Sequence, residues 1–435
     1  MCSELFRIPY SWGGMPIFGF GVLLAIWAVA STLTLASLVR RHGWSGETWG
    51  TIPMLVLIGA AIVGMPRLFP DGFPVRGYGV MLLVGISASV AAAMVRARQV
   101  GLNPEVILSG TIWLIVCGII GARLFYVVEY WGERFGRGNL QQTILEILNF
   151  PEGGLVIYGG FIGGILGVLY FARLHRIPFL ALADLGAPCF MIGLAFGRIG
   201  CFLNGCCYGG ETDRPWAVTF PKYSSRYEEE RPPALRRYTP PYSDQASRGE
   251  MLGFRIDSQG DQPAVVTRVD ANAPAAAAGL KVGDAIKSIN DTAVESNAHA
   301  RALLQFVTVE RPQTVRLVLG SGQSVVIPPT PLPDRSRPVH PAQLYSAIDA
   351  GLLAWLLWSF YPFRRRDGEV VALMMTIHPI TRFLLEIIRV DESAVFGTGL
   401  SISQNISIAF LVFAAGLWLY LSQQPRQTVW PRAAY

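Results

Sequence analysis

Nine long apolar stretches divide this chain of 435 residues, and they constrain its fold more than any other feature. Each is close to the roughly 20 apolar residues that a helix needs to cross the hydrocarbon core of a bilayer. Only 15% of the residues are charged, against about 25% in an ordinary soluble domain. The stretches predict membrane-spanning helices at residues 15–39, 51–68, 77–95, 105–127, 155–173, 180–204, 341–361, 369–389 and 401–422.

Arginines gather after every second apolar stretch. Basic residues are enriched in the cytoplasmic loops of membrane proteins, so these connections are expected on the cytoplasmic side. With an odd number of spans, the amino terminus then lies outside and the carboxyl terminus lies in the cytoplasm. The residues that carry this argument are Arg40, Arg41, Arg96, Arg98, Arg173, Arg176 and Arg364 to Arg366.

The segment between Gly205 and His340 is polar, rich in proline and too long for a simple loop, so it must hold a domain. Its order of strand-like and helical runs resembles a PDZ domain. In such domains an extended peptide is added beside a strand, and its carboxylate meets backbone N–H groups. The resemblance implies that these groups belong to Leu252, Gly253 and Phe254. A spacer domain with an unused groove is an equally good interpretation.

These patterns predict an all-α polytopic membrane protein of about nine transmembrane helices, with a small α+β PDZ-like domain inserted on its outer face. The expected divisions are two N-terminal helices at 1–72, the first part of the membrane domain with the start of an outer head at 73–245, the PDZ-like insert at 246–332, and the last three helices with a cytoplasmic tail at 333–435.

Several charged or polar residues lie inside the apolar stretches, where they are costly without a partner and mark candidate functional sites. Arg382 and Glu386 are spaced i and i+4, so they could simply neutralise each other. That interpretation leaves Arg123, Arg198 and Asn204 unexplained. The planar guanidinium group is suited to phosphate oxygens, so arginines that converge near the outer leaflet would suit a phospholipid headgroup.

The run Gly197 to Gly209 resembles the signature of the bacterial prolipoprotein diacylglyceryl transferases, Gly-Arg-x-Gly-Asn-Phe-x-Asn-Gly-Glu. The resemblance covers about residues 74–230 and 337–422, and leaves the first helices and the insert outside. Other motifs follow in the family's order: Gly77-Tyr78-Gly79, Gly121-Ala122-Arg123, Gly159-Gly160, His340 to Tyr345, and Arg382 with Glu386.

The resemblance implies a transferase of the bacterial inner membrane that moves the diacylglyceryl group of phosphatidylglycerol to the lipobox cysteine of a prolipoprotein signal peptide. It implies no cofactor, and no pattern points to nucleic acid. Arg198, Arg382, Glu386 and Tyr158 would be catalytic, with the arginines on the phosphate and on the charge of the leaving group. The implied substrate-binding residues are Tyr78, Arg123, Gly159, Gly160, Asn204, Gly209, His340, Gln343 and Tyr345.

Three residues depart from the family's pattern. Tyr158 stands where many members have histidine, Cys201 where they have asparagine and Cys206 where they have glutamate. The histidine base is therefore absent from its expected place, and Tyr158 is more plausibly a residue that orients substrate. The incoming thiol, with an ordinary pKa of about 8.5, could lose its proton beside the arginines. For Cys206 and Cys207, packing or a disulfide is a better expectation than nucleophilic attack.

Several other functions are disfavoured or remain as rivals. The five histidines form no HExxH motif, which excludes the metal-binding helix of a site-2 protease, and a rhomboid-like Gly-x-Ser-Gly element is missing. No CxxC pair or histidine spacing indicates a metal site. His378 is expected to be a hydrogen-bonded core residue, and a place in a cavity is the alternative. An inactive scaffold that binds lipid or a signal peptide remains the alternative to an enzyme.

Overall fold

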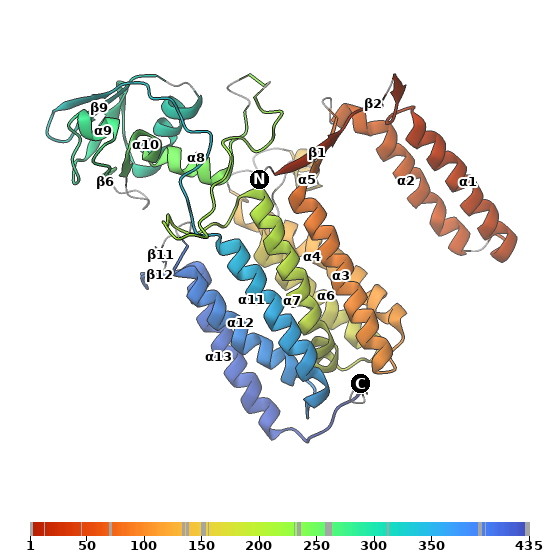
Figure 1. Ribbon diagram of the computed structural model, residues 1–435. Helices are drawn as coiled ribbons and strands as arrows, with labels where there is room; N and C mark the ends of the chain where they lie inside the picture. The colour runs from red at the N-terminus through yellow and green to blue at the C-terminus, as the bar shows by residue number, and fades with distance from the viewer. Residues whose placement is uncertain are drawn as a thin grey trace.

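The computed structural model describes residues 3–430 except 13, 45, 69–71, 133–134, 136–138, 149–153, 155, 230, 233–235, 257–262, 311–312, 390–393 and 396. Most of the described chain is helical (Figure 1). The helices outside the insert are α1 Val22–His42, α2 Gly46–Leu68, α3 Gly77–Gln99, α4 Pro104–Glu129, α5 Leu140–Leu148, α6 Ile157–Leu174, α7 Phe179–Asn204, α8 Pro240–Ser247, α11 Ala342–Phe360, α12 Glu369–Glu386 and α13 Ile402–Gln423.

In the described part of the chain, seven helices are long and apolar enough to cross a membrane: α1, α3, α4, α6, α7, α11 and α13. The other two expected stretches do form helices. The apolar part of α2 is shorter, at Thr51–Arg67. The 18 residues of α12 include Glu369, Arg382 and Glu386, so composition alone does not mark α12 as a span.

The bundle is held together by α3, α7 and α11, whose buried side chains form a continuous core. Beside them, α4 and α6 approach closely because glycines line their contact. A Cβ atom built on Gly121 would lie 2.4 Å from the carbonyl oxygen of Gly159 and 2.8 Å from the Cα of Gly163. The glycine-rich start of α6 therefore serves helix packing, as small residues four apart in an apolar helix usually do.

The connections define two ends of the bundle. The end that carries residues 205–341 is called the head end below. Ser3 reaches this end, where its N–H donates to the carbonyl of Ser224. At the opposite end, Arg366 donates to the carbonyl of Gln424 at the close of α13. The two termini of the described chain thus lie at opposite ends (Figure 1).

The first two helices form a pair beside the bundle. α1 packs mainly against α2, and the pair stands apart from the other helices in Figure 1. An antiparallel strand pair, β1 Glu4–Ile8 with β4 Phe73–Arg76, leads from this hairpin to the start of α3. The short strands β2 Ser11–Trp12 and β3 Met15–Pro16 precede α1. A further pair, β11 Ala394–Val395 and β12 Leu400–Ser401, precedes α13.

The insert is a compact α+β unit. Its strands are β5 Phe254–Ile256, β6 Val266–Val269, β7 Ile286–Ile289, β8 Thr292–Ala293, β9 Val315–Leu319 and β10 Ser324–Ile327, and its helices are α9 Pro274–Ala277 and α10 Asn297–Gln305. β5 pairs with β6, and the other strands form a sheet in the order β10-β9-β7-β8. β10 pairs with β9 at the edge of this sheet.

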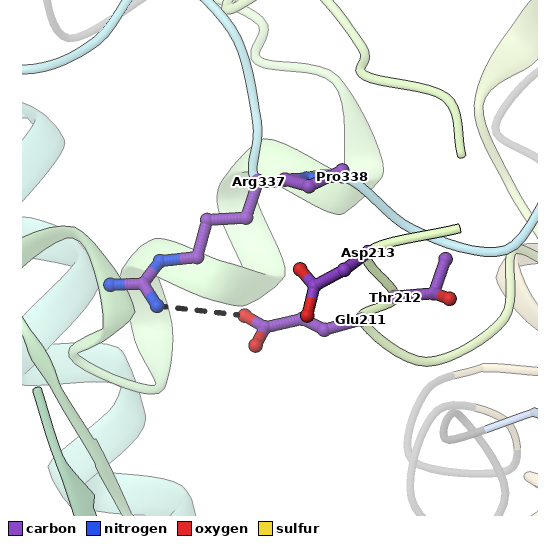
Figure 2. A pocket seen from close by; sticks show the side chains of 5 residues that line it. All are labelled: Glu211, Thr212, Asp213, Arg337 and Pro338. Carbon is purple, nitrogen blue, oxygen red and sulfur yellow. Dashed lines mark ion pairs between the residues drawn. The ribbon is translucent and has the colours of Figure 1, made fainter. Parts of the chain in front are cut away.

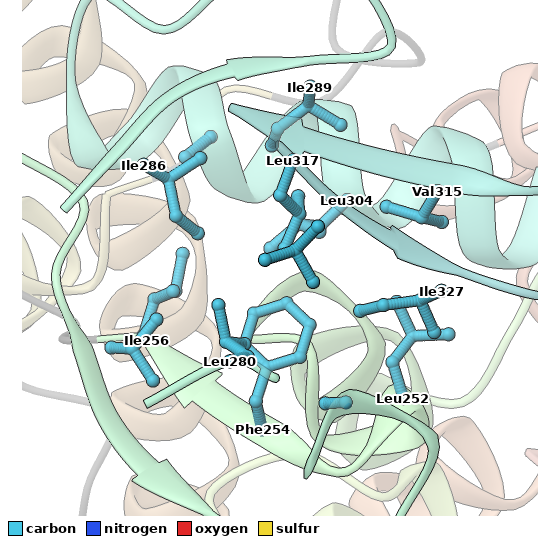
Figure 3. Close-up of a cluster of buried hydrophobic side chains, with 14 of the residues drawn as sticks. Leu252, Phe254, Ile256, Leu280, Ile286, Ile289, Leu304, Val315, Leu317 and Ile327 are labelled. Carbon is cyan, nitrogen blue, oxygen red and sulfur yellow. The ribbon is translucent and has the colours of Figure 1, made fainter. Parts of the chain in front are cut away.

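A single apolar core fills the insert (Figure 3). It runs in sequence from Leu252 to Ile327, inside the expected limits of 246–332, and includes Phe254 from β5, Leu304 from α10 and Leu317 from β9. Each of these side chains is at most 3% exposed. A core of this kind is what allows the insert to fold as a unit on the head rather than as an extended loop.

Candidate active site

The last turn of α12 holds a group of charged side chains. The guanidinium group of Arg382 donates to the carboxylate of Glu386 and, through Nη2, to Ser403 Oγ on α13 over 2.9 Å. Arg389 follows on the same segment, with Nη1 3.7 Å from the same Glu386 oxygen. Glu386 is 5% exposed, and a buried carboxylate is very costly without such cations. The expected i, i+4 pair therefore forms, and a second arginine shares it.

The sequence analysis did not single out Arg389. The feature that could have indicated it is its position, three residues after Glu386 and at the end of an apolar stretch. The side chain of Arg389 is 8% exposed, so it belongs to the buried group rather than to the solvated surface. Its backbone pairs with Gly209 in an isolated bridge, which joins the end of α12 to the loop after α7.

Arg198 reaches the same group from α7, which packs directly against α12. It lies within electrostatic range of Arg382 and of His378. Arg198 is six residues from the end of α7, so it lies about 9 Å inside the bundle along the helix axis. No acidic side chain among the described residues forms an ion pair with it. Among the described residues, Arg198, Arg382 and Arg389 are thus gathered near Glu386, and the guanidinium group of Arg198 favours an anion.

His378 lies one turn before Arg382 on α12, which places both side chains on one face. The prediction of a hydrogen-bonded core histidine is wrong, because Nδ1 is buried and has no hydrogen-bond partner among the described residues. Arg198 and Arg382 both act on it electrostatically. A buried polar atom without a partner is unusual, and here it belongs to the arginine site.

Tyr78, at the start of α3, faces the end of α7. A Cβ atom built on Gly200 would lie 3.1 Å from the Tyr78 ring, and Tyr78 is within electrostatic range of Arg198. Asn204 ends α7, and its side chain lies close to the Cys206 thiol. The sequence motifs on α3, α7 and α12 therefore come together at the head end of the bundle, as the resemblance implied.

The loop after α7 is tied to the start of α11. Gly205 has φ 78°, which ends the helix and turns the chain. The Gly209 N–H donates to the carbonyl of His340 over 2.9 Å, and a Cβ atom on Gly209 would lie 2.7 Å from the His340 Cβ. Gly209 thus allows a close backbone approach. We therefore assign it to loop packing, where the sequence analysis expected a substrate contact.

The start of α11 holds this loop through side chains. Gln343 is fully buried, and its Nε2 donates to the carbonyl of Cys206 over 2.7 Å. Its Oε1 has no hydrogen-bond partner in the described part of the chain. His340 Nδ1 lies 3.2 Å from the hydroxyl of Tyr345, one turn into the helix. Gln343 and the carbonyl of His340 thus hold the loop after α7, and Tyr345 contacts His340.

Arg123 does not lie free to meet a substrate. This 5%-exposed side chain on α4 donates to the carbonyls of Glu146, Ile147 and Gly154, at 2.7, 2.8 and 3.1 Å. It satisfies carbonyls of α5 and of the connection to α6 that would otherwise be costly to bury. This differs from the expected role in substrate binding. The sequence could not have indicated it, because α5 was not predicted.

Tyr158, Gly159 and Gly160 begin α6 at the head end. Tyr158 is 38% exposed. The close contact of Gly159 with α4 gives this glycine a packing role, whereas a Cβ atom on Gly160 would meet only ordinary contacts, the nearest being the Ala122 Cβ at 3.7 Å. The roles that the resemblance implied for Tyr158 and Gly160 in the reaction stay predictions.

Comparisons with known proteins show which family the chain belongs to. A family model described as prolipoprotein diacylglyceryl transferase matches residues 66–420. A protein of Rhodopirellula baltica named phosphatidylglycerol–prolipoprotein diacylglyceryl transferase is 32% identical over 96% of this chain and 88% of its own length. The chain belongs to the prolipoprotein diacylglyceryl transferase family.

Other members of the transferase family align over a shorter part. Proteins of the same name from Trichormus variabilis and Clostridioides difficile are 35% and 36% identical. These alignments cover 38% and 34% of this chain, and 54% and 57% of the relatives. This chain therefore matches about half the length of these relatives, and nearly the whole of the Rhodopirellula relative.

The insert of this family member does not offer the expected peptide groove in the described structure. The N–H groups of Leu252 and Phe254 donate to the carbonyl of Gly249, and that of Gly253 donates to Glu250. The N–H of Ile256, on the edge of β5 away from β6, donates to the carbonyl of Arg248. The chain itself thus uses the groups that were expected to receive a peptide carboxylate.

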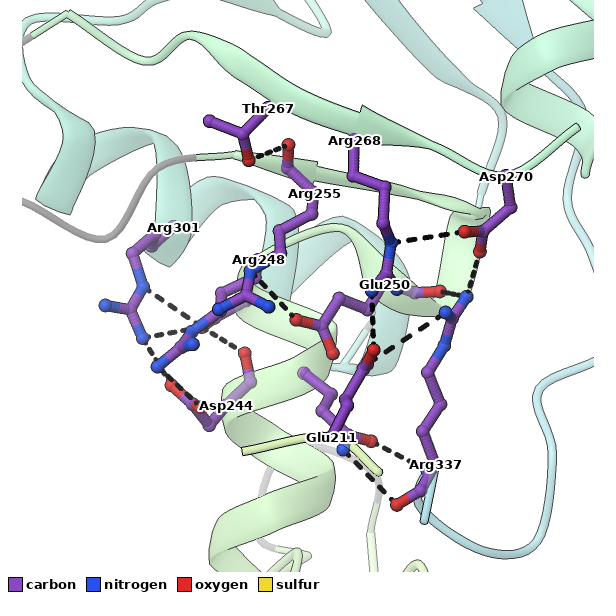
Figure 4. Close-up of polar contacts among 12 residues, drawn as sticks. Glu211, Asp244, Arg248, Glu250, Arg255, Thr267, Arg268, Asp270, Arg301 and Arg337 are labelled. Carbon is purple, nitrogen blue, oxygen red and sulfur yellow. Dashed lines mark hydrogen bonds and ion pairs between the residues drawn. The ribbon is translucent and has the colours of Figure 1, made fainter. Parts of the chain in front are cut away.

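The head helix α8 covers the same side of the insert. It packs along α10, where Arg301 donates to Asp244 over 2.5 Å and to Ser247 (Figure 4). Asp244 also accepts from the hydroxyl of Tyr208, in the loop after α7, over 2.6 Å. One carboxylate therefore links α10 of the insert to the loop that carries the signature motif.

A second ionic network joins the insert to the head. Arg268 on β6 donates to Glu211 over 2.6 Å, and Arg337 donates to Asp270 over 2.5 Å and to the carbonyl of Glu250 (Figure 4). Burial, and then the hydrogen bond with Glu211, raise the pKa of Glu250 to about 8. The pKa of Glu211 is lowered although burial opposes this, because Arg268 and Glu250 hydrogen-bond to it. At neutral pH the two carboxyl groups thus share a proton.

A small hollow of about 220 Å³ lies beside this network, lined by Glu211, Thr212, Asp213, Arg337 and Pro338 (Figure 2). Arg337 points at Glu211 across it, over 4.0 Å. Four of its five lining residues are polar or charged, so it does not suit the diacyl part of a lipid. The arginine site between α7 and α12 is the better candidate for lipid chemistry.

Proposed function

We propose that this chain transfers the diacylglyceryl group of phosphatidylglycerol to the lipobox cysteine thiol of prolipoproteins. The observation that carries the proposal is the meeting of Arg198 from α7 with Arg382 from α12 inside a helix bundle, beside the Glu386 carboxylate and Arg389. Family membership supports the reaction, and the guanidinium groups at this site suit the phosphate of the lipid. An inactive lipid-binding scaffold would keep these groups without turnover.

The reaction exchanges one bond for another. The cysteine sulfur forms a bond to the sn-3 carbon of the diacylglyceryl group, and the bond from that carbon to the phosphate oxygen breaks. The products are a thioether and glycerol phosphate, and the thiol proton is released. Negative charge grows on the leaving phosphate oxygen, and Arg198 and Arg382 are positioned to stabilise it. The ion pair with Glu386 fixes the direction of Arg382 before the lipid arrives.

His378 is our candidate for the proton acceptor. The histidine that many family members carry is replaced by Tyr158, and the buried Nδ1 of His378 has no hydrogen-bond partner among the described residues. The buried imidazole lies beside Arg198 and Arg382, so a proton on it is compatible with their charge only once the phosphate of the lipid is bound. With the lipid in place, the imidazole would accept the thiol proton as negative charge grows on the leaving phosphate.

For the membrane topology we propose nine spans, with α2 and α12 added to the seven apolar helices. α12 packs between α7, α11 and α13, so the bundle would screen its charged residues from lipid. The arginines after α3 and α6 lie at the end opposite to the head. The positive-inside tendency then places that end and the carboxyl terminus in the cytoplasm, and the amino terminus and insert outside.

For the insert we propose a PDZ-like fold. Its strand and helix order supports this, and α8 with Arg248 and Gly249 occupies the side on which a peptide would be added. A peptide ligand would have to displace this segment. Without displacement the insert acts as a spacer that braces the loop after α7 through Tyr208 and Asp244.

The direct test is a lipid-transfer assay. The purified full chain, in micelles that contain phosphatidylglycerol, should modify a lipobox peptide and release glycerol phosphate. Arg198→Ala should strongly reduce the rate of release, whereas Arg173→Ala, an exposed arginine at the opposite end of the bundle, should retain it. Folded protein that releases no more glycerol phosphate than the Arg198→Ala variant would favour the scaffold.

A further inference from the structure

Three cysteines meet where α7 ends. The sulfur atoms of Cys201, Cys206 and Cys207 all lie within 4.8 Å of one another, and all three are free thiols. The sequence shows only a Cys-x4-Cys-Cys spacing, which gave no reason to expect a metal site. The turn at Gly205 brings them together, and Cys207 itself has φ 59°, in the left-handed region that side chains seldom adopt.

The backbone holds this thiol group in a fixed loop. The Cys206 N–H donates to the carbonyl of Cys201 over 3.2 Å. From the other side, the buried Gln343 donates to the carbonyl of Cys206 over 2.7 Å. All three cysteines are partly exposed, so an ion can reach them. The sulfur atoms are therefore both gathered and accessible.

Two guanidinium groups lie close to the three thiols, because Arg389 and Arg198 are both within electrostatic range of Cys207. A site of three sulfur ligands carries excess negative charge when it binds a monovalent ion. The two nearby guanidinium groups offset that charge, and Arg198 has no acidic ion-pair partner among the described residues.

We propose that Cys201, Cys206 and Cys207 bind one soft metal ion through their sulfur atoms, and that Cu(I) fits the site best. Thiolates select soft ions such as Cu(I) and Zn²⁺. A structural zinc site needs four ligands in a tetrahedron. Among the described residues, the group holds three ligand atoms from cysteine, histidine or carboxylate side chains, which favours a three-coordinate ion. Each thiol that binds releases its proton to the solvent.

The test uses the full chain in detergent, reduced and kept free of oxygen. Cu(I) is supplied from a chromophoric chelator, so the amount taken up is read from the loss of the chelator's colour. The wild-type chain should bind one equivalent of Cu(I). The affinity for Cu(I) should fall at least about tenfold in each of the variants Cys201→Ser, Cys206→Ser and Cys207→Ser. Cys117→Ser, on α4 and outside the group, should bind as the wild type does. Circular dichroism of each variant checks that the helices remain.

The measurement is independent of transferase activity. Uptake by a folded triple serine variant equal to that of the wild type would overturn the proposal. So would a disulfide among the three cysteines that persists under reduction, which appears as a mass lower by two hydrogens. X-ray absorption at the copper edge should report sulfur neighbours in the wild type, and a first shell of nitrogen or oxygen would also reject the site.

Discussion

At the residue scale, the main feature of the site is that the carboxylate of Glu386 pairs with two arginines. Glu386 accepts from Arg382 and lies 3.7 Å from Arg389, while Arg198 stays without an acidic ion-pair partner in the described chain. An arginine that is already paired has little capacity for an anion. In the described chain it is therefore Arg198 that is left to meet a phosphate.

Replacing Glu386 by Gln should lower the rate of transfer. The amide keeps the shape but loses the charge that orients Arg382, and a hydrogen bond to a charged group contributes about 1.5–3 kcal/mol. We expect kcat/KM for the lipobox peptide to fall about 10- to 100-fold. Glu105→Gln, an exposed acid at the start of α4, is the matched control. An unchanged rate in Glu386→Gln would mean that Arg382 needs no partner.

His378 gives a separate prediction. If its imidazole accepts the thiol proton, His378→Ala should lower kcat by about 10²- to 10⁴-fold, as the loss of a general base does. KM for phosphatidylglycerol should change little, because the arginines remain. His175→Ala, at the opposite end of α6, should leave both constants unchanged. A rise in KM without a fall in kcat would assign His378 to lipid binding instead.

At the element scale, helix packing and insert docking follow from different physical causes. The α4–α6 contact depends on the absence of side chains at Gly121 and Gly159, and so on van der Waals fit. The contact between insert and head depends on ionic hydrogen bonds around Glu211 and Asp244. The stability of the α4–α6 contact should therefore depend on side-chain volume at the glycines. The stability of the contact between insert and head should depend on pH.

Alanine substitutions at two adjacent glycines, Gly159 and Gly160, distinguish a role in helix packing from a role in substrate binding. Gly159→Ala should destabilise the bundle by about 1–3 kcal/mol, because its Cβ would lie 2.4 Å from the Gly121 carbonyl oxygen. Gly160→Ala should change stability much less, since its nearest contact is at 3.7 Å. Thermal unfolding in detergent measures both variants. Equal melting temperatures for the two would contradict the packing role of Gly159.

The docking of the insert should weaken as the pH rises. The pKa of Glu250 is about 8 in the folded chain against an ordinary value of 4.5, so the folded state binds the proton more tightly. Its contribution to stability is complete below about 4.5 and is lost as the pH rises through 8. Hydrogen exchange at β5 and β6 should therefore speed up several-fold beyond its intrinsic pH dependence. Glu250→Gln should remove this effect, whereas Glu295→Gln, an exposed acid of the insert, should keep it.

At the scale of the whole molecule, the sequence was informative wherever a property depends on a run of residues. The apolar stretches predicted the helices, and the composition of residues 205–340 predicted an inserted domain with its own core. The motifs on α3, α7 and α12 pointed to residues that the fold brings together. These expectations depend on periodicity and on local patterns, which need no knowledge of tertiary contacts.

The sequence was uninformative where the role of a side chain depends on a distant partner. Arg123 binds carbonyls of α5, a helix that the sequence analysis did not expect. The N–H groups of Leu252 and Gly253 are used by a turn that lies only a few residues earlier, but only the folded insert shows this. The three cysteines and the buried nitrogen of His378 likewise became visible only with the bundle assembled.

The central claim is that the guanidinium groups of Arg198 and Arg382 act together on one phosphate. A double-mutant cycle on kcat/KM for phosphatidylglycerol tests it, with Arg198→Ala, Arg382→Ala and the combined variant in one assay. Residues that act as a unit show losses that do not add. We predict that the combined variant is little slower than the slower single variant. Losses that multiply independently would show that the two arginines serve separate sites, and would contradict the account.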